Sequence, residues 1–113
     1  MQGLEGVKVL ELGNMVSAAY ATKLMADLGA DVIKVEELTG DRARQRGPFP
    51  GGIVDAEKSG LFLYLNANKQ SVTLNLRTPR GHALLQSLCA QADVVIHNYR
   101  PSEMAAVGLE YDT

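Results

Sequence analysis

The sequence predicts an α/β protein built on a partial Rossmann-like parallel sheet of about four strands with flanking helices. Segments typical of strands alternate with segments of helical periodicity, which is the pattern of a parallel sheet joined by helices. Two of the strand segments are apolar nearly throughout, as parallel strands covered on both faces usually are. The 113 residues suffice for one small domain with one core, so we expect residues 1–113 to belong to a single domain. Doubly wound sheets usually have more than four strands, so we interpret the chain as the front part of something longer.

The first part of the chain reads as strand, helix and strand. Buried strands are expected at Val7–Leu12 and Asp31–Glu36. Gly29 is well placed to end the helix between them, and Ser17 is expected to cap its start. The helix itself is predicted from apolar residues at helical spacing, namely Ala21, Leu24, Met25 and Leu28.

A long segment without clear periodicity follows, over residues 38–60. It is rich in Gly, Pro and charge, and loops of this length are usually functional or mobile. Arg42, Arg44 and Arg46 lie in it. They form either a solvated basic loop or a docking surface for phosphates, whose oxygens guanidinium groups match in a bidentate way.

The second half repeats the alternation. A short helix is expected at Leu61–Leu65, a strand at Val72–Leu76, and a helix start at Thr78-Pro79 as N-cap and first position. A fourth strand is expected at Asp93–Tyr99, and residues 101–109 suggest a short last helix. The apolar face of the third helix is predicted to consist of Leu84, Leu85, Leu88, Cys89 and Ala92.

The bulk properties exclude several classes. A net charge of -2 gives no general attraction to nucleic acid or to an anionic membrane. No apolar run approaches the roughly 18 residues of a membrane span, and no signal pattern opens the chain. Cys89 is the single cysteine and is interpreted as a core residue, while His82 and His97 lie in different predicted elements. We therefore expect a cytoplasmic protein without a disulfide framework or a metal site.

Familiar nucleotide and catalytic motifs fit poorly. The first turn, ELGNMVSA, has one glycine where a dinucleotide fingerprint needs three, although Glu36 ends the second strand as its acid would. A phosphate-binding P-loop is absent, and Asn75 and Arg77 do not supply the acid that a receiver domain requires. Ser17 has no evident histidine to activate it as a nucleophile.

Two polar clusters are candidates for binding. Ligands of open α/β sheets bind at the carboxyl ends of the strands, and Asn98, Tyr99 and Arg100 follow the fourth strand. An amide, a flat ring and a cation suit an adenine nucleotide. The other cluster, Asn66 with Asn68 and Lys69, crowds the start of the third strand and has no obvious role.

Four segments in the same order resemble the N-terminal part of the class III CoA-transferases. This family includes formyl-CoA and carnitine-CoA transferases and the related α-methylacyl-CoA racemases. The segments are LEGVKVLELG, AAYATKLMADLGADVIKVE, LNANKQSVTLNLRTPRG and ADVVIHNYRP. Together they extend over nearly the whole chain, and the longer loop GDRARQRGPFPGG is more similar to the transferases than to the racemases.

The resemblance implies a Rossmann-like domain that binds coenzyme A at the strand ends, in subunits that interlock as a homodimer. The substrates implied are an acyl-CoA and a carboxylic acid, with no metal. An aspartate carboxylate attacks the thioester, passes through an anhydride and carries CoA as an aspartyl thioester to the acceptor, which is covalent catalysis. With Arg100 of the polar cluster included, the cofactor-binding residues expected are Val16, Ser17, Leu74, Arg77, Asn98, Tyr99 and Arg100.

The sequence also departs from the family pattern. Glu37 and Ala106 stand where relatives have basic residues, and Ala18-Ala19 replaces a glycine-proline pair. Weaker contact with the CoA phosphates is expected unless a loop arginine substitutes. The resemblance places the nucleophilic aspartate beyond residue 113, so no catalytic residue is expected within the chain. We interpret the sequence as a fragment or truncated member of the transferases, inactive alone. A stand-alone CoA-binding or interaction module and a racemase fragment remain alternatives.

Overall fold

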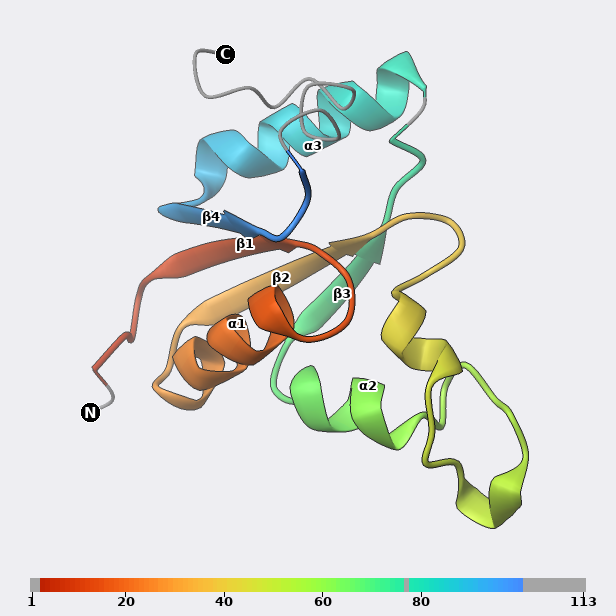
Figure 1. Cartoon of the computed structure of the whole chain (residues 1–113). Coiled ribbons are helices and arrows are strands. Elements are labelled where there is room, and N and C mark those ends of the chain that lie inside the picture. Colours follow the sequence, from red (N-terminus) through yellow and green to blue (C-terminus); the bar gives the residue numbers. More distant parts are fainter. Residues whose placement is uncertain (1–2, 77, 101–113) are drawn as a thin grey trace.

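The computed structural model describes residues 3–76 and 78–100 and contains a four-stranded sheet (Figure 1). The strands are β1 (Lys8–Leu12), β2 (Asp31–Glu36), β3 (Gln70–Thr73) and β4 (Val94–His97). They lie in the order β3-β2-β1-β4, and every pair is parallel, which confirms the predicted fold class. The chain runs outward from β1 to β3 and then crosses to β4 on the other side of β1. This reversal creates a topological switch point at the carboxyl ends of β1 and β4.

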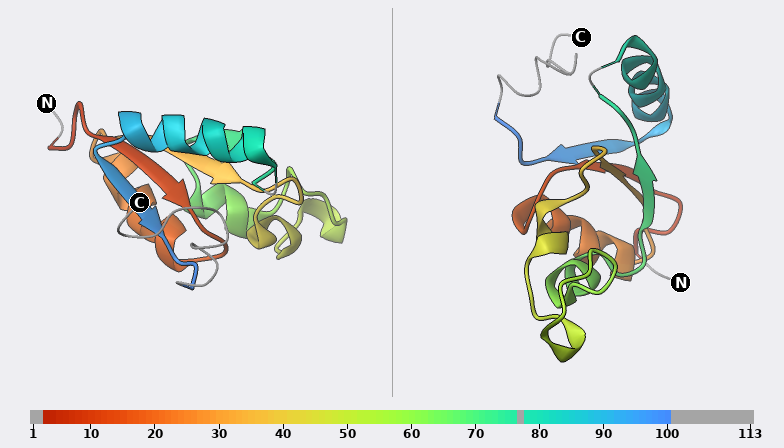
Figure 2. Two further views of the ribbon diagram at one scale, coloured as in Figure 1. Left: turned by 90° about the horizontal axis from the view of Figure 1, so that it is seen from above. Right: turned by 90° about the vertical axis from the view of Figure 1, so that its right-hand side faces the viewer.

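Helices cover both faces of the sheet, as Figure 2 shows. Helix α3 (Pro79–Gln91) lies on one face, and α1 (Ser17–Asp27) and α2 (Gly60–Leu65) lie on the other. The long segment between β2 and α2 is not wholly irregular, because it contains two short 3-10 helices, η1 (Arg42–Gln45) and η2 (Pro50–Gly52). In the described ranges, no helix has the length and apolarity needed to cross a bilayer.

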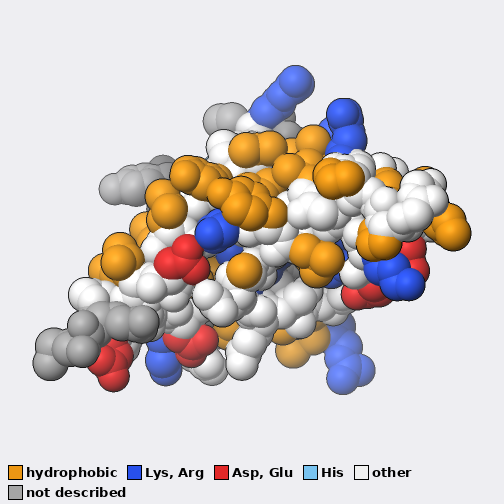
Figure 3. All heavy atoms as spheres, turned by 90° about the horizontal axis from the view of Figure 1, so that it is seen from below, with side chains coloured by type: hydrophobic (Ala, Val, Ile, Leu, Met, Phe, Trp, Pro, Cys, Tyr) orange, Lys and Arg blue, Asp and Glu red, His pale blue; other side chains and the backbone are white. Residues whose placement is uncertain are grey.

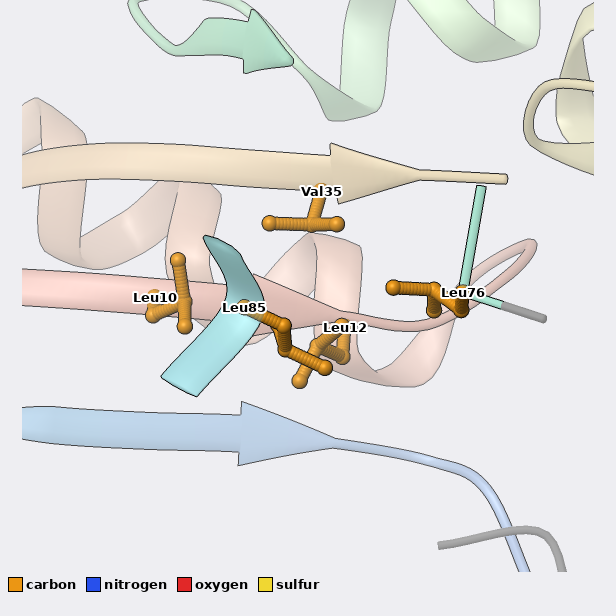
Figure 4. Close-up of a cluster of buried hydrophobic side chains, with 5 residues drawn as sticks. All are labelled: Leu10, Leu12, Val35, Leu76 and Leu85. Carbon is orange, nitrogen blue, oxygen red and sulfur yellow. The ribbon is translucent and has the colours of Figure 1, made fainter. Parts of the chain in front are cut away.

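The face beneath α3 holds an apolar cluster in which Leu85 of α3 packs over the strands (Figure 4). Thr78 caps α3 as predicted, since its Oγ1 accepts a hydrogen bond from the Gly81 amide at 3.0 Å. A Cβ on Gly81 would lie 1.8 Å from the carbonyl oxygen of Asn75, so only glycine lets the helix start this close to the end of the β3 segment. The cluster consists of Leu10, Leu12, Val35, Leu76 and Leu85.

On the opposite face of the sheet, the buried residues change from apolar to charged along the strands. Near their amino ends, Val9 and Val32 pack against Ala26 and Ala30 in a second apolar cluster. Farther along β1 and β2, the inward positions on this face carry charge: Glu11 of β1 pairs in register with Lys34 of β2. The carboxyl half of this face therefore combines buried polar side chains with the buried apolar residues of α1 and α2.

Helix α1 shows two differences from the sequence prediction. Its buried face carries small residues, Ala18, Ala19, Thr22 and Ala26, while Leu24 and Leu28 are 46% and 53% exposed. Short side chains let the helix lie close to the sheet, which turns the larger ones outward. The expectation that Ser17 caps the helix is wrong, because Val16 occupies the cap position without a side-chain hydrogen bond and Ser17 is already helical.

The remaining boundaries agree with the sequence to within a few residues. Gly29 follows α1 with a φ of +101°, a left-handed conformation that suits glycine at a helix end. The third strand begins two residues earlier than predicted, at Gln70, yet the Leu74 amide still donates to the Glu36 carbonyl at 3.0 Å. The helix expected at residues 101–109 lies outside the described residues.

Candidate functional site

A polar cavity of about 280 Å³ opens at the switch point of the sheet. Its walls come from the segments that follow β1, β2 and β4, the place where open α/β sheets bind ligands. The described lining residues are Gly13, Asn14, Glu36, Glu37, Thr39, Gly40, Asp41, Arg42 and Tyr99.

The turn after β1 is fastened to the end of β4 by Asn98. Its Oδ1 accepts from the Asn14 amide at 3.1 Å, and its Nδ2 donates to the Asn14 carbonyl at 2.7 Å and to Ser17 Oγ at 3.1 Å. A Cβ on Gly13 would lie 2.5 Å from Asn98 Oδ1, so a larger residue at this position would displace the docked amide. These contacts set one wall of the cavity.

Asp41 joins the same turn to the segment after β2. Its Oδ1 accepts from the amides of Met15 at 2.9 Å and Ala43 at 2.8 Å. Its Oδ2 forms an ion pair with Lys34 Nζ at 2.7 Å, although the geometry is not that of an aligned hydrogen bond. Met15 has a φ of +64°, which is unusual for a residue with a side chain. The Asp41 carboxylate holds the turn in this conformation.

A buried ion network is joined to the cavity through the ion pair of Lys34 with Asp41. The Glu11 carboxylate accepts from Thr22 Oγ1 at 2.6 Å, from Lys34 Nζ at 2.7 Å and from Lys69 Nζ at 2.6 Å. Burial raises the pKa of Glu11, but Lys34 together with the hydrogen bonds outweighs burial and lowers it. Lys69 also donates to the Ala19 carbonyl and to Asn66 Oδ1, so all three ammonium protons have acceptors.

This network explains the polar cluster before β3. Lys69 extends from the start of β3 to β1, and Asn66 supports its ammonium group. Burial lowers the pKa of Lys69 despite the adjacent Glu11. Asn68 turns the chain with a φ of +65° and donates to Asp27 of α1. Two residues of the cluster thus fasten β3 to β1 and α1.

Glu36 and Arg44 form a second ion pair next to the first. Arg44 Nε and Nη2 each donate to a different Glu36 oxygen at 2.8 Å, and the guanidinium stacks on Phe62 at 3.7 Å. Burial raises the pKa of Glu36, but hydrogen bonds from Arg44, Ser71 and the Asp41 amide lower it to about 2. Arg44 is therefore occupied by Glu36, and the hypothesis of phosphate docking is left to Arg42 and Arg46.

An apolar cavity of about 360 Å³ adjoins the polar one. Its lining comes from the ends of the β2 and β3 segments: Glu37, Leu38, Thr39, Leu74, Asn75 and Leu76. Glu37 and Thr39 line both cavities. One elongated ligand with an apolar part and a polar part suits this pair of cavities better than a compact one.

The sequence profile of CoA-transferase family III matches residues 4–113. The chain belongs to this family. It is 38% identical to the cinnamoyl-CoA:phenyllactate CoA-transferase of Clostridium sporogenes over 108 residues, covering 96% of this chain and 26% of that protein. It is 41% identical to the succinyl-CoA:glutarate CoA-transferase of Mus musculus over 113 residues, which covers 99% of this chain and 25% of that protein.

A solved structure of the same family shares the fold. The CAIB/BAIF family protein from Brucella suis superposes with a TM-score of 0.86 at 37% identity, covering 98% of this chain and 29% of that protein. The family III chain thus spans about a quarter of the length of the curated relatives it matches.

Several of the residues that the family resemblance suggested for CoA lie at these two cavities or close to them. Leu74 lines the apolar cavity and Tyr99 the polar one. Ser17 and Asn98 contact each other at the turn after β1, next to the exposed Val16. Arg100 is exposed and lines neither of the two cavities, and Arg77 lies outside the described residues. The assignment of all seven to CoA stays a prediction.

Sequence reasoning missed the residues that shape the family III site from below. Glu11 lies between two leucines of its strand segment, Lys34 lies between Ile33 and Val35, and Asp41 is an acid in a loop. Opposite charges at the centres of two neighbouring buried strands are the signal that could have revealed an ion pair, because an unpaired buried charge is strongly unfavourable.

Proposed function

We propose that the chain binds coenzyme A across the two adjoining cavities, as the N-terminal part of a transferase that moves CoA between acyl-CoA thioesters and carboxylic acids. In the intact protein, an aspartyl-CoA intermediate would carry the group. The observation that carries the proposal is the pairing of an apolar cavity with a polar one at the switch point of the sheet. An adenine ring suits the first and phosphates suit the second.

The rigidity of the site supports a binding role. The side chains of Asn98, Asp41 and Glu36 accept hydrogen bonds from backbone amides of the turn after β1 and of the segment after β2. A cavity whose walls are fixed before the ligand arrives loses less conformational freedom on binding. Part of the affinity for CoA is therefore built into the fold.

Within the described residues, no aspartate is placed to act as the nucleophile. Asp41 is the aspartate that lines the cavity, and both of its oxygens are occupied by Met15, Ala43 and Lys34. Such a carboxylate is a poor nucleophile. We therefore propose that the chain by itself binds CoA without transferring it, and detection of CoA transfer by the purified 113-residue chain would contradict this.

Calorimetric titration with CoA tests the binding proposal. Thr39 is exposed and lines both cavities, so Thr39→Trp should fill their junction and abolish the binding heat without disturbing the core. Ser87→Trp on the exposed side of α3 is the matched control and should bind as the parent does. No heat with the parent chain, or equal binding by Thr39→Trp, would refute the site.

Self-association is a second part of the proposal. Large exposed apolar residues recur at intervals of four along α1 and its two cap positions: Val16, Tyr20, Leu24 and Leu28. Figure 3 shows hydrophobic side chains gathered on the face seen from below. We propose that a second copy covers this stripe, in keeping with the homodimer implied by the family. Leu24→Lys should then lower the mass measured by sedimentation, and an unchanged mass would argue against this interface. The cytoplasm stays the compartment we expect.

A further inference from the structure

The charges that line the polar cavity do not all remain available to a ligand. Its described lining contains three carboxylates, Glu36, Glu37 and Asp41, and one guanidinium, that of Arg42. Glu36 is neutralised by Arg44 and Asp41 by Lys34, at distances of 2.8 and 2.7 Å. The local charge that a ligand meets is therefore set by Glu37 and Arg42.

Four backbone amides beside the cavity are also occupied. The Met15 and Ala43 amides donate to Asp41, the Arg42 amide donates to Asn14 Oδ1 at 3.0 Å, and the Asp41 amide donates to Glu36. Many α/β proteins bind phosphate with such amides. In this chain these four hold the walls together, which favours recognition of an anion by a side chain.

Arg42 has the side chain that can bind an anion in the polar cavity. It begins η1 at the rim of the cavity and is exposed. Among the described residues, its guanidinium forms no ion pair, whereas that of Arg44 is bound by Glu36. Its own amide is fixed to Asn14, which anchors the base of the side chain beside the cavity. A guanidinium matches two phosphate oxygens at once.

We propose that Arg42 binds a phosphate group of the ligand in the polar cavity and that Glu37 opposes this binding by repulsion. The inference rests on the proposed CoA site and names the pair that sets its affinity. Glu37 lies across both cavities and, in the described part of the chain, has no cationic partner. The pair makes affinity for a phosphorylated ligand depend on two exposed residues that the core does not need.

Calorimetric titration of three variants with CoA tests this pair. Arg42→Gln should weaken binding about tenfold, the loss expected for one charge-assisted hydrogen-bonded contact. Glu37→Gln should strengthen binding several-fold, on the order of three- to fivefold, because it removes a like charge beside the phosphate. Lys58→Gln, an exposed charge change in the same long segment but outside both cavities, should change nothing. Circular dichroism and thermal unfolding check that each variant folds as the parent does.

Titration with dephospho-CoA identifies the phosphate. If Arg42→Gln weakens CoA binding but leaves dephospho-CoA binding unchanged, Arg42 binds the 3′-phosphate. If it weakens both equally, Arg42 binds the diphosphate, and either result supports the role of Arg42. Unchanged CoA affinity in Glu37→Gln would contradict the repulsion assigned to Glu37. Should the parent bind CoA while Arg42→Gln binds it equally well, this inference is wrong and the proposed site survives. Failure of the parent to bind CoA would overturn both.

Discussion

Asn98 and Asn14 join β4 to the turn after β1 through two hydrogen bonds between one side-chain amide and one backbone unit, at 3.1 and 2.7 Å. The Asn98 amide therefore has a structural role in addition to the contact with CoA that is predicted for it. It closes the switch point of the sheet, and the turn that it holds lines the polar cavity. The shape of the site and the attachment of β4 to the turn after β1 therefore both depend on the side chain of Asn98.

The substitution Gly13→Ala should break the contact between the Asn98 amide and the turn after β1. The added Cβ would lie 2.5 Å from Asn98 Oδ1, so the amide must leave the turn. We expect a loss of about 1 to 3 kcal/mol in the free energy of unfolding, together with weaker CoA binding by calorimetry. Gly3→Ala, where a Cβ meets nothing within 4 Å, is the control and should leave both unchanged. Parental CoA affinity in Gly13→Ala would show that the turn does not shape the site.

The lowered pKa of Glu36, which pairs with Arg44, predicts that the free energy of unfolding falls at low pH. The pKa of Glu36 lies at about 2 in the folded chain against an ordinary value of 4.5. The unfolded chain therefore binds the proton more readily, and the stabilisation is fully present above pH 4.5 and lost between about pH 4.5 and 2. Arg44, Ser71 and the Asp41 amide, which all donate to Glu36, together account for about 3 kcal/mol of that loss.

Urea denaturation at a series of pH values measures this effect. Glu36→Gln should lower the free energy of unfolding at pH 7 and flatten its fall below pH 4.5. Glu57→Gln removes an exposed carboxylate 3.4 Å from the same Arg44 and should keep the parental profile. Equal slopes for the parent and Glu36→Gln would mean that another carboxylate governs the acid transition.

The Glu11–Lys69 contact at 2.6 Å predicts strong coupling between two buried charges. Within the part of the chain that the structure describes, Glu11→Gln leaves Lys69 without a carboxylate partner, and Lys69→Met leaves Glu11 with Lys34 as its remaining cation, so each variant should destabilise the fold by about 3 kcal/mol. The double variant should cost about 1 to 3 kcal/mol less than the sum, as a double-mutant cycle by urea denaturation would show. The exposed pair Lys23–Asp27 serves as the reference and should show no measurable coupling. Additive effects at Glu11 and Lys69 would contradict the network.

Gly81→Ala should destabilise the packing of α3. The new Cβ would lie 1.8 Å from the Asn75 carbonyl oxygen, which is backbone and cannot rotate away. We expect the free energy of unfolding to fall by about 3 kcal/mol or more. Ser87→Ala on the exposed side of the same helix should have little effect. A parental melting temperature for Gly81→Ala would show that the helix start can move without loss.

Much of the fold was predictable because its signals are local. Thr78 and Pro79 mark the start of α3 because a hydroxyl can cap a helix and proline suits its first position. Gly29 marks the end of α1 because its left-handed conformation excludes most side chains. Helical spacing located α1 but did not identify its buried face. Small residues such as Ala26 let the helix lie close to the sheet, and the larger Leu24 is turned toward solvent.

The sequence by itself determined the alternation of strands and helices, the parallel sheet and the family, because periodicity, caps and motifs are properties of neighbouring residues. Only the tertiary structure decided which charged side chains form ion pairs within the protein. Glu36 occupies Arg44 and leaves Arg42 without an ion pair among the described residues. Three arginines at alternate positions look alike in a sequence, and only their distances from buried carboxylates distinguish the structural one from those left to solvent or ligand.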